Sequence, residues 1–158
     1  MDIDSFTGDH AFLSNFAPCP VRCPDDPDGQ PYPSVEHAFQ ASKTLSGAQR
    51  QAVRAAPSPG AAKRMGRAVD LRDGWDEAKG DVMLGLLRQK FAVEPYRSLL
   101  AGTGEARLVE GNRWHDQEWG DCRCQAHAGE PGANMLGALL ERVRAEAADA
   151  AAVADGEA

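Results

Sequence analysis

Apolar residues recur at three- and four-residue intervals along much of this chain, which predicts a protein built mainly from short helices. The clearest helix start follows Tyr32 and Pro33, where Ser34 is a typical N-cap residue, and Ser58 before Pro59 marks another. The predicted helices cover about 35–45, 48–55, 59–67 and 76–91, and a last helix begins at a capping Asn134. Short strands are expected within 1–20, at 68–71 and at 107–110, with loops at 22–33 and 111–133.

The first predicted helix carries the most informative pattern. Glu36, Gln40 and Lys43, with Phe39 beside them, fall on one stripe by the three- and four-residue rule. A neighbouring apolar stripe would anchor the helix; its members are Val35, Ala38 and Leu45. The helix either presents an acid, an amide and an amine to a cleft, or it is an ordinary amphipathic helix with a solvated charged face. His37 lies about 100° round the helix from Glu36, so we expect it to be structural or at a rim.

Composition and charge narrow the class of protein. The chain has 158 residues, 42% of them hydrophobic and 26% charged, which is ordinary for one soluble domain. Its net charge of −7 excludes a globally basic surface for duplex nucleic acid, although a local basic site stays open. No apolar run reaches the length of a membrane span, and the first residues lack signal-peptide features, so we expect a cytoplasmic protein with reduced thiols. We expect one domain over 1–144, then an alanine- and acid-rich tail, 145–158, that extends the last helix and frays.

A basic segment of the third predicted helix is a candidate phosphate site. Lys63 and Arg67 are four residues apart, with Arg64 between them, and Gly66 would let a ligand or another backbone approach closely. Cations just after a helix N-terminus suit a phosphate. The alternative is a solvated basic face that pairs with two aspartates nearby.

The predicted loop after residue 110 combines two tryptophans with acids, which is typical of loops that carry function. Trp114 and Trp119 could stack on a planar base, and Asp116 could act as a general acid or base. The alternative is that the indoles fill the core and the acids lie at the surface.

The four cysteines do not follow the usual spacing of a metal site. Cys122 and Cys124 are separated by one residue, unlike zinc ribbons, and Cys19 and Cys23 lie far upstream. His127 and Cys19 would complete a tetrahedral zinc set only if the fold brought them together. Buried thiols are the better interpretation, so we expect no metal, no other cofactor and no cysteine nucleophile.

Several of these segments occur in the order and spacing of a known family. They are Phe12-Leu13-Ser14-Asn15-Phe16, Tyr32 to Ala41, Ala62-Lys63-Arg64-Met65-Gly66-Arg67, Glu110-Gly111-Asn112, Trp114-His115-Asp116, Trp119-Gly120 and Gly132-x-Asn134-x-Leu136-Gly137. On these motifs the chain resembles the NADAR family of YbiA-like proteins, over about Phe6 to Arg144. The resemblance implies an α+β fold, mainly helical with a small sheet, and a metal-free N-glycosidase activity. Some members resemble enzymes that cleave the ribosylaminopyrimidine phosphates of riboflavin synthesis, and others remove ADP-ribose from modified guanine.

Both substrate types join a sugar C1 to an exocyclic amine, so the glycosylamine can open to an imine that exchanges with an enzyme amine. The resemblance implies an acid and a lysine near the first helix, and we assign Lys43 as Schiff-base nucleophile and Glu36 as proton shuttle, with Lys63 as the rival amine. A lysine serves if burial or a neighbouring cation depresses its pKa. Asp116 would protonate the leaving base or steer the sugar hydroxyls. The predicted substrate-binding residues are Asn15, Phe16, Gln40, Lys63, Arg64, Arg67, Asn112, Trp114, Trp119 and Asn134.

Two other functions stay open beside the N-glycosidase: a module that reads ADP-ribose without cleaving it, and a metal-dependent hydrolase. The expected partner is a ribose-phosphate or ADP-ribose small molecule, or ADP-ribosylated DNA or RNA, and no membrane. The chain departs from the family at Ala126-His127, where relatives often have a further cysteine, which argues further against metal or thiol chemistry. An insert from Asp25 to Gln30 lengthens the loop before the first helix and leaves the choice of substrate open.

Overall fold

Serine N-caps start two helices at the residues that the sequence predicts. In the computed structural model, which describes residues 1–157, the Ser34 hydroxyl accepts a hydrogen bond from the His37 amide at 3.1 Å. The Ser58 hydroxyl accepts one from the Ala61 amide, also at 3.1 Å. Helices α1 (Val35–Ser42) and α3 (Pro59–Met65) follow these caps, so local capping chemistry decides where both begin.

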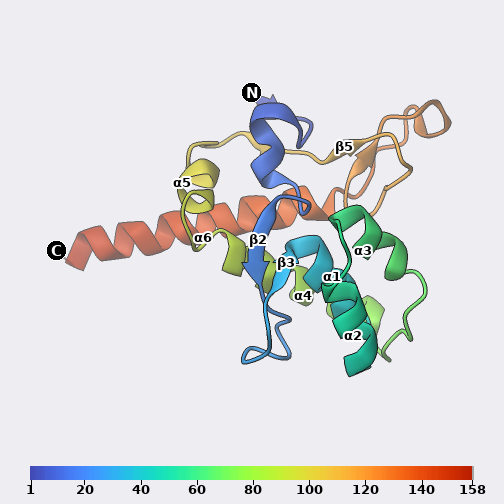
Figure 1. The fold of residues 1–158 in the computed structure, drawn as a ribbon. Coiled ribbons are helices and arrows are strands. Elements are labelled where there is room, and N and C mark those ends of the chain that lie inside the picture. The colour runs from blue at the N-terminus through green and yellow to red at the C-terminus, as the bar shows by residue number, and fades with distance from the viewer. Residues whose placement is uncertain (158) are drawn as a thin grey trace. The chain divides into compact units, whose positions relative to one another are not determined.

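The chain divides into two compact units, and residues 15–92 form the one that we call the central unit. Its other elements are β2 (Pro18–Val21), β3 (Tyr32–Ser34), α2 (Gly47–Arg54) and α4 (Trp75–Lys90). The two strands pair antiparallel, and β3 leads directly into α1. Helix α1 packs against both strands and against α2, α3 and α4, so it is the core element of this unit (Figure 1).

The terminal unit consists of residues 1–14 and the chain from Val93 onward. Its elements are β1 (Asp2–Ile3), the 3-10 helix η1 (Gly8–Leu13), α5 (Tyr96–Ala101), β4 (Arg107–Leu108), β5 (Gly111–Asn112), β6 (Asp121–Cys122), the 3-10 turn η2 (Gln125–His127) and α6 (Met135–Glu157). Strand β1 pairs in parallel with β4, and β5 with β6. Helix α6 buries Leu136, Leu140 and Val143, as its periodicity predicts, and runs to Glu157 as the long red helix of Figure 1. The expected fraying of 145–158 stays a prediction.

The predicted fold class, α+β and mainly helical, is confirmed, and the strands of residues 1–157 form three two-stranded sheets. The strand expected at 68–71 is wrong, because the described chain has only a bend and irregular backbone there. Helix α1 ends at Ser42 rather than Leu45, and α3 ends at Met65 rather than Arg67. Helix α5 and the β5–β6 pair were not predicted, since elements of two to six residues carry too little periodicity to be recognised.

Candidate functional site

Helix α1 is buried along its whole length, so the alternative of a solvated charged face is wrong. Glu36 is only 7% exposed and Gln40 only 4%. The Gln40 side-chain amide donates to Glu36 Oε1 at 2.8 Å, and the Glu36 backbone amide donates to the Asn15 carbonyl at 3.1 Å. The expected apolar anchor is correct for Val35 and Ala38 and wrong for Leu45, which is 69% exposed beyond the helix end. An acid and an amide are thus held together inside the central unit.

Lys43 lies at the C-cap of α1, where the backbone still has helical angles (φ −64°, ψ −22°). Its side chain is half-buried, with Nζ 6.0 Å from the centroid of the Phe39 ring. The Phe39 ring in turn packs on Trp75 at 5.2 Å between centroids. The stripe predicted on α1 therefore continues from Glu36 through Gln40 to the half-buried amine just after the last helical turn.

Two arginines hold the turn that follows Lys43. The Arg72 amide donates to the Lys43 carbonyl at 2.7 Å, and Arg50 Nε donates to the Thr44 carbonyl at 2.7 Å. Asp25 joins both arginines: it takes a bidentate pair from Arg50 at 2.9 and 2.8 Å and one bond from Arg72 at 3.4 Å. The hydrogen bonds from Arg50 hold the pKa of Asp25 below its usual range. The inserted loop is thereby tied to α2 and supports the backbone around Lys43.

His37 has the structural role that was expected. It is buried, with Nδ1 2.7 Å from the Ser34 hydroxyl and Nε2 3.1 Å from the Ala56 carbonyl. Only the tautomer protonated on Nε2 satisfies both contacts, because a carbonyl can only accept. The imidazole therefore joins the start of α1 to the chain after α2.

The basic segment in α3 does not have the predicted geometry. Lys63 and Arg64 lie in the last turn of α3, and Arg67 follows the helix, so the cations are at its C-terminal end and the helix dipole does not assist anion binding. Lys63 is half-buried, and Arg64 and Arg67 are exposed. The close approach expected at Gly66 is made by the Gln40 side chain, since a Cβ there would overlap Gln40 Oε1. A phosphate site on these cations stays a prediction.

Two buried acceptors of the central unit accept no hydrogen bond from the described residues: Asn15 Oδ1 and Gln40 Oε1. The Asn15 amide nitrogen donates to Met83 Sδ at 3.6 Å, while the neighbouring Phe16 ring is largely exposed. Buried oxygens without a donor are uncommon in proteins, and a ligand hydroxyl or N–H is one way to satisfy them. Both residues belong to the predicted substrate-binding set.

The other predicted site residues lie in the terminal unit, in a segment that we call the tryptophan loop (residues 111–134). Asn112 organises it: its Oδ1 accepts from the amides of Trp114 and Asp116 at 3.2 Å each, and its Nδ2 donates to the Asp116 carbonyl at 2.8 Å. Asp116 Oδ1 accepts from the amides of Glu118 and Trp119 at 3.1 and 2.8 Å. These polar side chains are used to shape the loop, and their contacts with substrate stay a prediction.

The two tryptophans differ in exposure. Trp114 is 57% exposed, so it does not fill the core, whereas Trp119 is half-buried. Asn134 is buried at the end of the loop, where its side chain accepts from the Glu110 amide at 3.0 Å and donates to the Leu108 carbonyl at 2.9 Å. Its side chain therefore joins the loop to β4.

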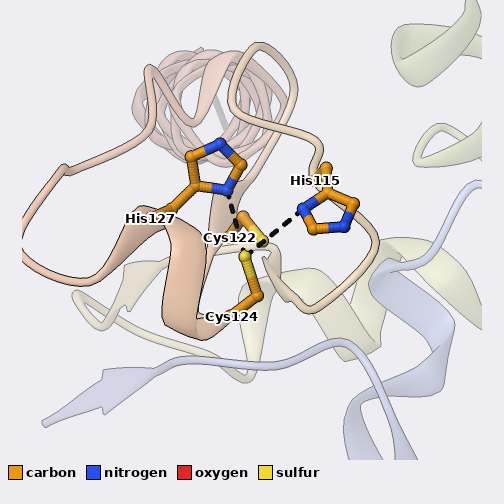
Figure 2. Close-up of side chains that lie close together, drawn as sticks. All are labelled: His115, Cys122, Cys124 and His127. Atoms are coloured by element: carbon orange, nitrogen blue, oxygen red, sulfur yellow. Dashed lines mark hydrogen bonds between the residues drawn. The ribbon is translucent and has the colours of Figure 1, made fainter.

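The loop also gathers thiols and imidazoles that the sequence did not combine. Figure 2 shows the imidazoles of His115 and His127 on either side of Cys124, with Cys122 behind. The Cys124 sulfur lies 3.3 Å from His115 Nδ1 and 3.1 Å from His127 Nδ1. The fourth member is His115, not Cys19, which is buried in β2 of the central unit. Burial raises the pKa of Cys122, but hydrogen bonds from the Cys124 backbone and the His127 side chain outweigh it and lower this pKa to about 7.

The family model of the NADAR domain matches residues 5–147. The chain belongs to the NADAR family. It is 39% identical over 147 residues to the N-glycosidase YbiA of Escherichia coli (strain K12), covering 91% of this chain and 86% of that protein. The NMR structure of E. coli YbiA matches with a TM-score of 0.76 and 38% identity, covering 94% of this chain and 84% of that one. A riboflavin biosynthesis protein of Vibrio vulnificus (strain YJ016) is 33% identical over 140 residues, which cover 87% of this chain and 35% of that protein.

This NADAR chain has one further unusual amine, which the sequence analysis missed. Lys90, at the end of α4, has no exposed surface, and desolvation by burial lowers its pKa to about 8 although the nearby Cys19 opposes the shift. Its Nζ lies 5.1 Å from the centroid of the Phe91 ring. Because a fully enclosed amine cannot meet a sugar, Lys90 is a poor candidate for the nucleophile despite its lowered pKa.

Among the described residues, no helix combines the length and hydropathy that crossing a bilayer would require.

Proposed function

We propose that this NADAR protein is an N-glycosidase that hydrolyses the bond between ribose C1 and an exocyclic amine, through a Schiff base on Lys43. The observation that carries the proposal is the buried Glu36–Gln40 pair, followed on the same stripe by the half-buried Lys43 amine. A buried acid that is bonded to a fixed amide suits proton transfer, because its position is set before substrate binds. The name of the E. coli relative, N-glycosidase YbiA, also supports this proposal.

The proposed reaction conserves atoms in three steps. First, the ring C1–O4 bond breaks, the proton of the exocyclic N–H passes to O4, and C1 becomes an imine of the base amine. Second, neutral Lys43 Nζ adds to C1, Glu36 passes the two protons of Nζ one after the other to the base nitrogen, and the C1–N bond to the base breaks, which releases the base amine and leaves C1 as an imine of Lys43. Third, water adds to the C1–Lys43 imine and the amine leaves, which returns the free sugar and the lysine.

In this proposal, each part of the substrate meets a different chemistry. A ribose hydroxyl would donate to Asn15 Oδ1 or Gln40 Oε1, the two buried acceptors without a donor. The cations Lys63, Arg64 and Arg67 would contact the phosphate. Riboflavin-pathway ribosylaminopyrimidine phosphates are the first substrate to test, because relatives carry names from that pathway. ADP-ribose on guanine, free or in nucleic acid, has the same exocyclic linkage and is the second.

The test is reductive trapping. The full chain is incubated with each substrate and sodium borohydride, and intact mass and peptide mapping locate any sugar adduct. We expect one adduct on Lys43, no adduct in Lys43→Ala, and an adduct still present in the control Lys63→Ala. Turnover in Lys43→Ala should fall to background.

Two outcomes would contradict the proposal. An adduct that persists in Lys43→Ala and disappears in Lys63→Ala would transfer the role to the rival amine. Tight binding of ADP-ribose by calorimetry, with no product from either substrate over hours, would instead make the chain a binding module.

A further inference from the structure

Four side chains with metal-ligand chemistry converge within the tryptophan loop. One ligand atom from each of His115, Cys122, Cys124 and His127 lies within 4.8 Å of all the others (Figure 2). In a tetrahedral zinc site the distances between ligand atoms are about 3.3 to 3.8 Å, as the usual Zn–N and Zn–S lengths require. The observed separations between sulfur and nitrogen, 3.1 and 3.3 Å around Cys124, need only small adjustments to reach that geometry.

Backbone structure, rather than side-chain flexibility, brings these residues together. Cys122 ends strand β6, and η2 carries His127 back toward the two thiols. His115 has a φ of 70°, a left-handed conformation that is uncommon for a residue other than glycine. The amide of Cys122 is fixed by a 2.6 Å bond to Gln117 Oε1, which joins the two halves of the loop. The positions of all four side chains are therefore determined by the fold of the loop.

The cluster is accessible to an ion from solution. Cys122, Cys124 and His127 line a hollow of about 490 Å³ that is formed by residues 121–131. Cys122 is buried, whereas Cys124 and His127 are half-buried and His115 is exposed. Binding of an ion would displace the thiol protons of Cys122 and Cys124, since thiolates are the ligands.

The donor set indicates which ion would bind. Two thiolates with two imidazoles form a soft, tetrahedral set that selects Zn²⁺ over oxygen-preferring cations such as Mg²⁺ or Ca²⁺. Four protein ligands also fill the coordination sphere, which is typical of structural zinc and leaves no position for an activated water. A metal-dependent hydrolase is therefore not what this cluster supports.

We propose that His115, Cys122, Cys124 and His127 bind one Zn²⁺ ion in a four-ligand structural site that holds the tryptophan loop in its folded conformation. The ion joins His115, which directly follows Trp114, to the chain after Trp119, so it fixes both ends of the segment that contains Trp119. This inference does not depend on the proposed N-glycosidase reaction.

The first experiment measures metal content. Full-length protein without a histidine tag is purified under reducing conditions, and zinc is quantified by mass spectrometry of the elements. We expect about one zinc per chain with a Kd below about 100 nM, the range of structural zinc sites. Zinc should fall to background in Cys124→Ser and in His115→Ala and stay at one per chain in Cys23→Ser, the same change at a thiol outside the cluster.

The second experiment keeps the proposal testable if a variant fails to fold. Wild-type protein is stripped with a chelator and titrated with Co²⁺, and we expect a thiolate-to-cobalt ultraviolet band with the strong visible bands of a tetrahedral site. Hydrogen exchange should become faster in residues 112–128 after chelation and stay unchanged in α1. The proposal is overturned if wild type holds no more zinc than Cys124→Ser, if the cobalt spectrum is weak and octahedral, if exchange in the loop ignores the chelator, or if Cys122 and Cys124 are found as a disulfide.

Discussion

Helix α1 in the central unit and the tryptophan loop in the terminal unit each carry predicted site residues, and the two regions are held in different ways. In α1 all eight residues are buried, and a helical ladder satisfies the backbone. The two strands within the loop, β5 and β6, are each two residues long. The backbone turns between them are bonded instead by the side chains of Asn112, Asp116 and Gln117.

This difference shows where each region is vulnerable. A substitution that keeps volume leaves α1 in place, since packing against five neighbouring elements positions the helix. The loop depends on individual polar atoms, so the loss of one amide or carboxylate side chain releases several backbone groups at once. Acid-to-amide changes therefore separate chemistry from structure in both regions, because an amide keeps one carbonyl acceptor.

The largest expected effect comes from Glu36→Gln. The variant keeps an oxygen that can accept from Gln40 and loses the carboxylate, so we expect kcat to fall by about 10²- to 10⁴-fold with little change in unfolding free energy. Asp116→Asn is the matched change in the loop, since it keeps an acceptor for the Glu118 and Trp119 amides. Steady-state kinetics measures kcat, and urea unfolding measures the free energy of unfolding.

Full activity in Glu36→Gln would exclude the Glu36 carboxylate from the mechanism. Full activity in Asp116→Asn would leave Asp116 with a structural role only.

The next largest effect is the pH dependence of the unfolding free energy that the buried Lys90 causes. The pKa of Lys90 is about 8 in the folded protein against 10.5 for a free lysine, so the unfolded chain binds more protons between these values. Stability should therefore rise with pH across this window, because the penalty for a buried ammonium is complete below pH 8 and is relieved as the folded lysine loses its proton. The rise approaches about 3 kcal/mol at most.

Lys90→Met removes this pH dependence. Urea unfolding of wild type and variant from pH 7 to 10.5 should show the difference in unfolding free energy shrinking as pH rises. Both chains should carry Cys19→Ala, because that thiol interacts with Lys90 and burial raises its pKa above the ordinary value of a thiol. A difference that is flat with pH would mean that Lys90 keeps an ordinary pKa.

The smallest effect is expected from Asn112→Ala. The variant leaves the amides of Trp114 and Asp116 without their acceptor, and we expect a loss of about 2 kcal/mol in unfolding free energy. Asn112→Asp retains an acceptor and should lose less. Chemical denaturation with tryptophan fluorescence reports on the loop directly. Equal stability of Asn112→Ala and wild type would show that the loop does not depend on this side chain.

The sequence predicted the features that local chemistry decides. Ser34 and Ser58 act as caps through hydrogen bonds from backbone amides three residues later, so a short stretch of sequence is enough to predict them. The long helices α4 and α6 have enough turns for their apolar spacing to be recognised. Of the predicted stripe, Glu36, Phe39 and Gln40 lie in α1 and Lys43 is its C-cap, and the sequence did not predict that the whole helix is buried.

What the sequence could not predict depends on contacts distant along the chain. His115 joins Cys122 and Cys124 because β5 pairs with β6 and its own backbone is left-handed, and neither feature has a signal in periodicity. Lys90 ends an amphipathic helix, where a lysine is ordinarily exposed. Helix α3 ends at Met65, two residues before the predicted end, so Lys63 and Arg64 lie in its last turn and not just after its N-terminus. A difference of two residues is within the usual uncertainty of helix boundaries.

Two glycines set a limit on how the tryptophan loop could be redesigned. A Cβ at Gly120 would overlap the Glu110 carbonyl, and one at Gly132 would overlap the carbonyl of Gly120 itself. Since a main-chain oxygen cannot rotate aside as a side chain can, even alanine is excluded at both positions. A mutant library meant to change substrate preference should hold these two codons constant and vary the exposed neighbours Arg113, Trp114 and Glu118 instead.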